Sequence, residues 1–204
     1  MAGVLLVSSV RYDRGMTKKH IITIAGRLGS GKSSTAKTVA EALEYEHFSS
    51  GDLFRAIAAE QSQSVLDANV AAEKDSSIDY LVDQRLRDIG EHEDFKVVDS
   101  RTAWHWMPKS FKVYLNLPTD IAAKRIIDKA EERKTANEDI PSSVEEYAKQ
   151  LDVRYHSENK RYKNLYDIDP SDMSNYDLVL DTSKQNLSGV VDAIVSEYKK
   201  WLES

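Results

Sequence analysis

Short apolar runs alternate along the chain with longer segments in which apolar residues recur at helical spacing. The apolar runs predict strands near residues 20–25, 45–49, 95–99, 111–117 and 176–181. The helical spacing predicts helices over about 35–43, 50–60, 78–90, 119–127, 143–166 and 187–201. Because strands and helices alternate, the pattern favours an α/β fold with a mostly parallel sheet.

Two helix boundaries can be predicted from single residues. Ser50 or Asp52 is expected to cap the second helix, because both side chains accept hydrogen bonds from backbone N–H groups. The helix that starts near residue 78 is expected to stop at Gly90, since glycine often follows the last helical residue.

The first predicted strand runs into a glycine-rich loop. Its sequence, Gly26-Arg27-Leu28-Gly29-Ser30-Gly31-Lys32-Ser33, fits G-x-x-x-x-G-K-[ST] at every fixed position. The glycines let successive N–H groups point at phosphate oxygens, Lys32 reaches the β- and γ-phosphates, and the Ser33 hydroxyl can ligate Mg²⁺. A Gly/Ser turn is the alternative, but the preceding strand and following helix favour an ATP site over residues 26–34, with Ser34 at its end.

Composition narrows the class of protein. The chain has 204 residues, a formal net charge of −6 and no cysteine. The acidic balance gives no general field for nucleic acid, and no apolar run is long enough for a membrane span. We expect one cytoplasmic domain over 19–204, preceded by a loosely held extension over 1–18, with small-molecule partners and no nucleic-acid or membrane partner.

Charged residues lie at or just past the ends of two predicted strands, 45–49 and 95–99. Asp99 ends a strand, where a Mg²⁺-organising carboxylate belongs in a phosphate-loop protein, although it could simply cap a turn. Arg55 and Arg101 lie just past two strand ends and could each grip a phosphate; either one alone could be a surface residue.

The helix over 143–166 carries Arg154, Glu158 and Arg161 on one face. This spacing fits an ordinary solvated salt-bridge face. In a phosphoryl-transfer enzyme the same face could fold over the γ-phosphate, with Glu158 orienting an arginine and with Arg125 and Arg133 on the other side.

Aromatic residues of the second half are expected to pack rather than to bind ligands. This expectation covers Tyr155, Tyr162 and Tyr166 on the long helix, and Trp104-His105-Trp106 after Arg101. For the latter group, a stacking wall for a base is the alternative.

Together these residues resemble the cytidylate kinases, nearest to the short, archaeal-type branch. The resemblance extends in order from about His20 to the C-terminus, and it rests on the phosphate loop and on Ser50-Gly51-Asp52-Leu53-Phe54-Arg55, Asp99-Ser100-Arg101, the Arg154/Glu158/Arg161 face and Tyr176-Asp177-Leu178-Val179-Leu180-Asp181-Thr182-Ser183. It implies the P-loop nucleoside monophosphate kinase fold: a five-stranded parallel sheet, an acceptor-binding insertion at about 50–92 and a short lid at about 133–161.

The resemblance also implies roles for individual residues. Ser50, Gly51, Asp52 and Arg55 would bind the acceptor nucleotide, Arg101 would bind its phosphate or base edge, and Arg154 and Arg161 would act on the transferring phosphoryl group. Lys32, from its place in the phosphate loop, and Arg133, from its place beside the lid, are the other expected catalytic residues. Arg125, Thr182 and Ser183 would border the ATP base. In better-known bacterial relatives an aspartate that helps read cytosine follows the arginine matching Arg101, whereas this chain has Thr102 there.

The function expected from the sequence is therefore ATP- and Mg²⁺-dependent phosphoryl transfer to a pyrimidine nucleoside monophosphate, CMP or dCMP, by a monomer. Two alternatives stay open at this point. The same fold could act on another nucleotide or small metabolite, or the chain could be an ATP-binding regulator without catalysis.

Overall fold

The computed structural model describes residues 4–5, 17–61, 77–128 and 143–204. Within them, one sheet has the strand order β1-β6-β5-β2-β4-β3. The strands are β1 (Val4–Leu5), β2 (Ile21–Gly26), β3 (Glu46–Ser49), β4 (Lys96–Asp99), β5 (Phe111–Asn116) and β6 (Leu178–Asp181). Strands β2 to β6 are parallel, which confirms the predicted five-stranded parallel sheet. The two-residue β1 adds an antiparallel edge that was not predicted, because so short a strand leaves no periodic signal.

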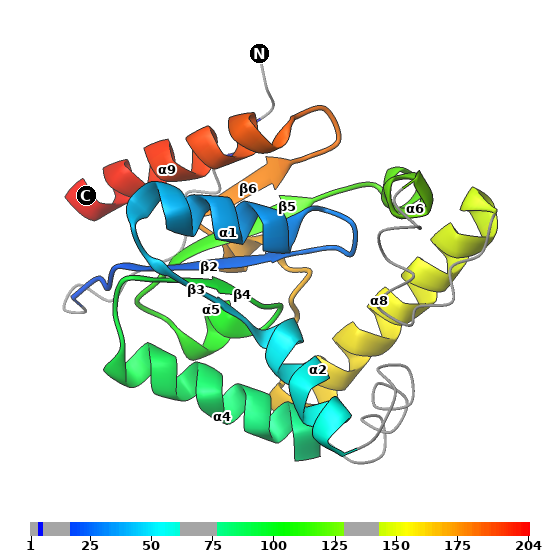
Figure 1. The fold of residues 1–204 in the computed structure, drawn as a ribbon, viewed down its shortest axis with the longest axis horizontal. Helices are drawn as coiled ribbons and strands as arrows, with labels where there is room; N and C mark the ends of the chain where they lie inside the picture. The colour runs from blue at the N-terminus through cyan, green and yellow to red at the C-terminus, as the bar shows by residue number, and fades with distance from the viewer. Residues whose placement is uncertain (1–3, 6–16, 62–76, 129–142) are drawn as a thin grey trace.

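Helices cover both faces of this sheet (Figure 1). They are α1 (Lys32–Leu43), α2 (Ser50–Glu60), α4 (Ser77–His92), α5 (Ala103–Trp106), α6 (Thr119–Asp128), α8 (Val144–Tyr166) and α9 (Leu187–Glu203), with a 3₁₀ turn at Met173–Asn175. Helices α1 and α9 lie on one face and α4 and α5 on the other, while α6 and α8 pack together beyond the carboxyl ends of the strands. Among the described residues, no helix is long and apolar enough to cross a bilayer.

The central strand β2 is buried on both sides, as is usual for a parallel strand. Ile22 and Ile24 pack in a cluster with α1 and α9, whereas Ile21 packs with Leu86 and Ile89 of α4. Because β2 is held from both faces, the loop that follows it starts from a rigid position.

Both predicted helix boundaries are wrong. Helix α2 is capped by Ser49, whose Oγ accepts a hydrogen bond from the Asp52 N–H at 3.3 Å; two adjacent serines gave the sequence no basis for choosing between them. Helix α4 continues past Gly90 to His92. A Cβ at position 90 would lie 2.7 Å from the Trp106 carbonyl oxygen, so this glycine permits a close approach of α5 rather than ending the helix.

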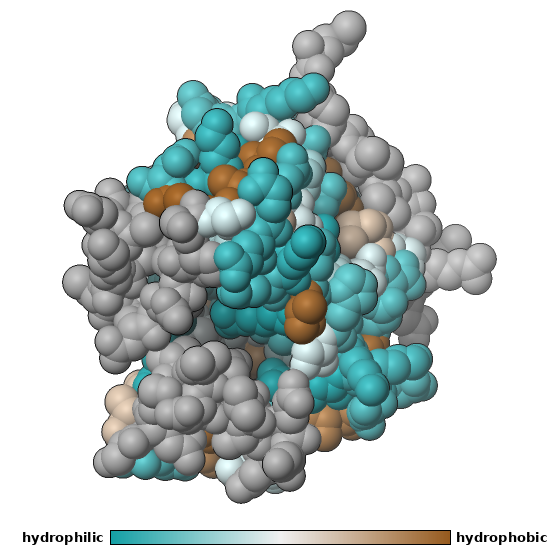
Figure 2. Space-filling view, turned by 90° about the vertical axis from the view of Figure 1, so that its right-hand side faces the viewer, coloured by the Kyte–Doolittle hydropathy of each residue, from teal (hydrophilic) through white to brown (hydrophobic). Residues whose placement is uncertain are grey.

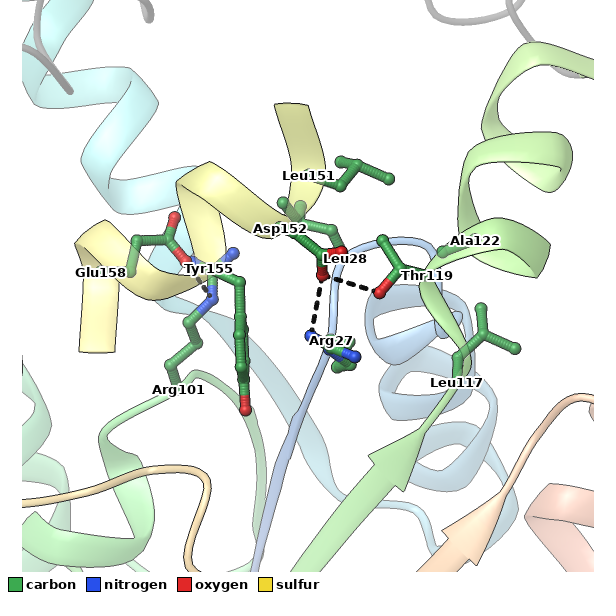
Figure 3. Close-up of a pocket in the computed structure, with 10 residues that line it drawn as sticks. All are labelled: Arg27, Leu28, Arg101, Leu117, Thr119, Ala122, Leu151, Asp152, Tyr155 and Glu158. Atoms are coloured by element: carbon green, nitrogen blue, oxygen red, sulfur yellow. Dashed lines mark hydrogen bonds and ion pairs between the residues drawn. The ribbon is translucent and has the colours of Figure 1, made fainter. Parts of the chain in front are cut away.

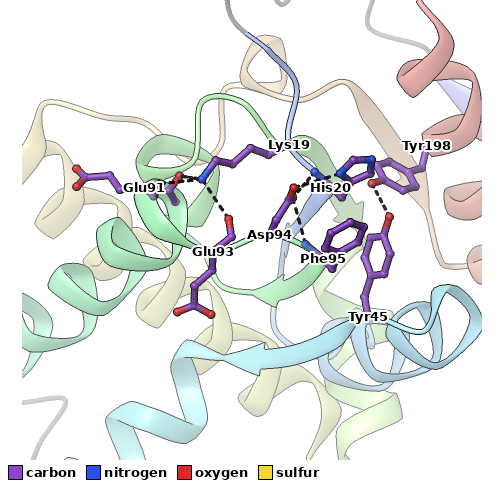
Figure 4. Close-up of polar contacts among 9 residues, drawn as sticks. Lys19, His20, Tyr45, Glu91, Glu93, Asp94, Phe95 and Tyr198 are labelled. Atoms are coloured by element: carbon purple, nitrogen blue, oxygen red, sulfur yellow. Dashed lines mark hydrogen bonds and ion pairs between the residues drawn. The ribbon is translucent and has the colours of Figure 1, made fainter.

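The far end of α4 is tied to the beginning of β2 (Figure 4). Lys19 Nζ donates to the carbonyl oxygens of Gly90, Glu91 and Glu93 at 2.9, 2.9 and 3.1 Å. An ammonium group at a helix C-terminus satisfies free carbonyl groups and complements the helix dipole. This contact fixes α4 lengthwise against the sheet, which matters for the acidic side chains at its other end.

Candidate active site

The carboxyl ends of the parallel strands meet at one edge of the sheet, where ligands bind in open α/β folds. The phosphate loop follows β2, Asp99 ends β4, and the loops after β3, β5 and β6 lie on either side. Seen from this side, the described surface is largely hydrophilic with few scattered apolar residues (Figure 2). This edge of the sheet is therefore suited to bind charged ligands.

The backbone of the phosphate loop adopts positive φ angles that glycine tolerates and other residues rarely adopt. Gly26 has φ 147°, and a Cβ there would lie 2.3 Å from the Leu115 carbonyl oxygen; Gly29 and Gly31 also have positive φ, at 76° and 87°. Helix α1 then starts at Lys32 without a side-chain cap and without an acidic residue in its first turn. Its free N–H groups and positive dipole end can therefore bind an anion, as the sequence predicts.

Lys32 lies inside this loop, and its Nζ donates to the Arg27 carbonyl oxygen at 3.0 Å. Burial, followed by the nearby positive charge of Arg101, lowers the pKa of Lys32 to about 8, while Asp99 and Glu158 act in the opposite direction. An ammonium group that is poorly solvated and close to other cations gains strongly from an anionic ligand.

The two predicted metal ligands are in direct contact. The Ser33 hydroxyl donates to Asp99 Oδ2 at 2.5 Å, between the start of α1 and the end of β4. Both are hard oxygen ligands, and Mg²⁺ is commonly held by one or two protein groups together with substrate phosphates and water. One hydroxyl and one carboxylate beside an anion-binding loop therefore fit a Mg²⁺ whose other ligands are phosphate oxygens and water.

Above the loop, α8 brings in a cluster of arginines and carboxylates. The buried Glu158 pairs through Oε1 with Arg154 Nε and through Oε2 with Arg101 Nε, both at 3.0 Å. Burial alone would raise the pKa of Glu158, but Arg101 and Arg154 outweigh it and the net pKa is below its ordinary value. One turn along α8, Arg161 Nε lies 3.4 Å from Oδ2 of the buried Asp79 on α4. The structure thus places Arg154 and Arg161 of one helix face near Glu158, adds Arg101 from the loop after β4, and brings in Asp79; the contact of these arginines with a phosphoryl group stays a prediction.

Between this cluster and the phosphate loop lies a pocket under α8 (Figure 3). Its lining residues are Arg27, Leu28, Arg101, Leu117, Thr119, Ala122, Leu151, Asp152, Tyr155 and Glu158. Arg27 Nη2 pairs with Asp152 Oδ1 at 3.2 Å, Thr119 donates to the same oxygen at 2.8 Å, and the Arg27 guanidinium lies 4.2 Å from the Tyr155 ring centroid. The sequence interpretation gave Tyr155 only a packing role and missed Asp152. Tyr155 lies three residues before Glu158, a spacing that could have placed it on the same helix face, whereas Asp152 lies six residues before Glu158 and has no such signal.

On the β6 side, the residues predicted to border the ATP base come together. Arg125 Nη2, from α6, donates to the carbonyl oxygens of Thr182 and Ser183 at 2.7 and 3.2 Å. The arginine therefore fixes the loop after β6 beside the phosphate loop.

The residues that follow β3 have fewer contacts with the other predicted site residues. Ser50, Gly51 and Asp52 form the first turn of α2, and Arg55 pairs with Asp52 while about half of its side-chain surface stays exposed. Arg55 is thus outside the Arg101 cluster in this structure, and its contact with an acceptor stays a prediction. Arg133 lies outside the described residues.

Thr102 is buried next to Arg101 and donates to Asp83 Oδ1 at 3.3 Å. Trp106 Nε1 donates to the same oxygen at 3.1 Å, and the Tyr166 hydroxyl donates to Asp83 Oδ2. Burial raises the pKa of Asp83, which these three hydrogen bonds oppose. The sequence interpretation missed Asp83, because nothing local indicates which acidic residues of α4 face inward.

Comparisons with known proteins point to one family. Residues 21–184 match the cytidylate kinase-like family. A cytidylate kinase from Haloarcula marismortui is 40% identical, with 84% of this chain and 85% of that protein covered. One from Natronomonas pharaonis is 39% identical, with 87% and 90% covered.

Solved structures with a similar fold are more distant in sequence. An uncharacterized protein from Eubacterium ventriosum has a TM-score of 0.59 at 21% identity, covering 90% of this chain and 98% of that one. Shikimate kinase from Bacteroides thetaiotaomicron has a TM-score of 0.58 at 14% identity, with the same coverage. These two likenesses show the fold, which is that of a P-loop kinase.

Proposed function

The chain belongs to the cytidylate kinase-like family, and from this premise we propose that it transfers the γ-phosphoryl group of ATP to the phosphate of CMP or dCMP. The observation that carries this proposal is the position of Lys32. Lys32 lies in an anion-binding loop. Together with burial, the charges of Arg101, Arg154 and Glu158 on the opposite wall of the site shift its pKa, so these groups lie near it. A phosphoryl group held between these walls would have Lys32 on one side and Arg101 and Arg154 on the other.

Phosphoryl transfer needs no side-chain nucleophile, because the acceptor's own phosphate oxygen attacks. The protein has to place two anionic substrates in line and neutralise the charge that develops between them. In this proposal the phosphate loop holds the β- and γ-phosphates of ATP, Lys32 balances their charge, and Arg154 and Arg161 contact the transferring group. Mg²⁺ at Ser33 and Asp99 would supply further charge neutralisation on the phosphates.

The strand order suggests how the two nucleotides share the site. Strand β2 carries the phosphate loop, with β5 and β6 on one side and β4 and β3 on the other. We assign the β6 side, with Arg125, Thr182 and Ser183, to the ATP base. The β4 side, with Arg101 and Thr102, and the start of α2, with residues 50–52 and Arg55, would take the acceptor.

The test is ADP production from Mg-ATP with CMP, dCMP, UMP, AMP and GMP offered separately, beside a control without acceptor. Turnover on CMP or dCMP well above the others supports the proposal. ATP binding without turnover on any nucleotide would refute the acceptor assignment and would favour a different acceptor or a regulator.

The expected quaternary state and location belong to the same proposal. We expect a monomer, whose molar mass by light scattering equals that of one chain, and we expect it in the cytoplasmic fraction of the cell. A stable dimer by light scattering would contradict the first point.

A further inference from the structure

Helix α4 carries two buried carboxylates one turn apart. Asp79 is 8% exposed and Asp83 is 5% exposed. Residues four apart share one helix face, and this face looks toward α8 and the loop after β4. Buried acidic side chains are rare unless they are paired, so each requires an explanation.

Asp83 is explained by its protein contacts. Both of its carboxylate oxygens accept hydrogen bonds, from Thr102 and Trp106 on one and from Tyr166 on the other. These three residues come from the loop after β4, from α5 and from the end of α8. Asp83 is therefore a positioning residue that joins three elements on the acceptor side.

Asp79 is different, because its Oδ2 has no hydrogen-bond partner among the described residues. The charged group opposite, Arg161 Nε, is 3.4 Å away but is not aligned for a hydrogen bond, and it too has no such partner there. A buried ion pair is favourable only when further hydrogen bonds satisfy its remaining atoms. The unsatisfied Oδ2 of Asp79 is therefore suited to accept a hydrogen bond from an N–H group of a ligand.

The location of Asp79 indicates which part of a ligand would reach it. Its partner Arg161 lies three residues beyond Glu158 on α8, a rise of about 4.5 Å along the helix. The arginines around Glu158 face the phosphate loop, so Asp79 lies further out on the acceptor side, where the base of a bound nucleotide would follow its phosphate. A carboxylate can accept a hydrogen bond from the exocyclic amino group of cytosine. Uracil presents a carbonyl oxygen at the same place, and two acceptors cannot bond.

We propose that Asp79 is a specificity-determining residue that accepts a hydrogen bond from the amino group of the acceptor base. This assignment rests on the proposed function, since it concerns the base of the same acceptor. Arg161 keeps the carboxylate oriented, and Asp83 holds the neighbouring wall in place.

The experiment compares kcat/KM for CMP and UMP in the wild-type enzyme, in Asp79→Asn and in Asp88→Asn. An amide at position 79 can donate to the uracil carbonyl, so the preference for CMP over UMP should fall by about 10-fold or more. Asp88 is on the same helix, with 55% of its side chain exposed, and its variant should keep the wild-type ratio. A general loss of structure would lower both rates and leave the ratio unchanged.

A second measurement needs no variant. The monophosphate of the pyrimidin-2-one ribonucleoside lacks only the amino group of CMP, and its kcat/KM in the wild-type enzyme should be at least about 10-fold lower than that of CMP. Equal values, or an unchanged CMP/UMP ratio in folded Asp79→Asn, would overturn the assignment while leaving the proposed function intact. Absence of wild-type turnover on every nucleotide would overturn both.

Discussion

Replacement of Glu158 by glutamine should have opposite effects on stability and on ATP binding. Glu158 has only 6% of its side chain exposed and joins Arg101 to Arg154. Glutamine keeps the shape and one acceptor oxygen, but it removes the negative charge and turns an NH₂ group toward an arginine. Two partly exposed guanidinium groups would then lose their shared counter-charge.

The size of the effect follows from burial. Removal of one partner from a fully buried ion pair costs about 3–5 kcal/mol. Here the arginine side chains are 24% and 38% exposed, and water screens part of the charge, so we expect a loss of about 2–3 kcal/mol. For a chain of this size, that loss lowers the melting temperature by about 4–12 °C.

ATP should bind Glu158→Gln at least as tightly as it binds the wild type, because its phosphates replace the missing negative charge. The ATP-induced rise in melting temperature should therefore be larger in the variant, measured by calorimetry at a fixed saturating concentration. The matched control is Glu146→Gln, an exposed residue of the same helix, with a change of no more than about 0.5 kcal/mol. An unchanged melting temperature in Glu158→Gln, or a smaller ATP-induced rise, would refute this reasoning.

Four further predictions test other parts of the site. Lys32→Ala should abolish phosphoryl transfer while leaving the circular dichroism spectrum unchanged; an active variant would contradict the role of the phosphate loop. The pKa of Lys32 is lowered to about 8 in the folded protein without ATP, so Lys32 loses its charge above this pH. The dissociation constant of ATP, measured by titration calorimetry, should therefore rise about tenfold between pH 7 and pH 9. Lys32→Arg should remove this pH dependence. The lowered pKa also affects folding. Burial of the charged Lys32 lowers the free energy of unfolding of the ATP-free protein below pH 8, and this cost disappears as the pH rises toward 10. Gly26→Ala should lower stability by at least about 2 kcal/mol in denaturant titration, since its Cβ would meet the Leu115 carbonyl oxygen, whereas wild-type stability would show that the strand can shift. Arg125→Ala should raise KM for ATP about tenfold with little change in KM for CMP, and an equal effect on both would contradict the assignment of the β6 side to ATP.

The sequence could predict the phosphate loop and the parallel strands because their signals are local. The loop depends on three glycines, a lysine and a serine at fixed spacing, and most strands are short, largely apolar runs, although β3 (Glu46–Ser49) is only partly apolar. The sequence could place Arg101 just past a strand end and Glu158 on a charged helix face, but their pairing follows only from the way α8 lies over the loop after β4.

Residues that reach the site from α4 and from the pocket side of α8 could not be predicted in the same way. Asp79 and Asp83 belong to a helix whose other acidic residues, such as Asp88, are exposed, and only packing against the sheet decides which face is buried. Asp152 and Tyr155 face the pocket because α8 packs on α6, a contact between segments that the sequence does not link. Gly90 was misinterpreted for the same reason, since its close neighbour is Trp106 from another helix.

The three arginine contacts have a common geometry that explains why carboxylates are present in a site for anions. Glu158 pairs with the Nε atoms of Arg101 and Arg154, and Asp79 lies opposite the Nε atom of Arg161. A carboxylate at Nε holds one edge of the guanidinium group, whereas the two terminal nitrogens on the other edge form the fork that grips a phosphate. The acidic residues can therefore balance charge before the nucleotides arrive without occupying the phosphate-binding edge. Catalysis by preorganised charge requires that the arginines already point the right way, and these carboxylates can supply that orientation.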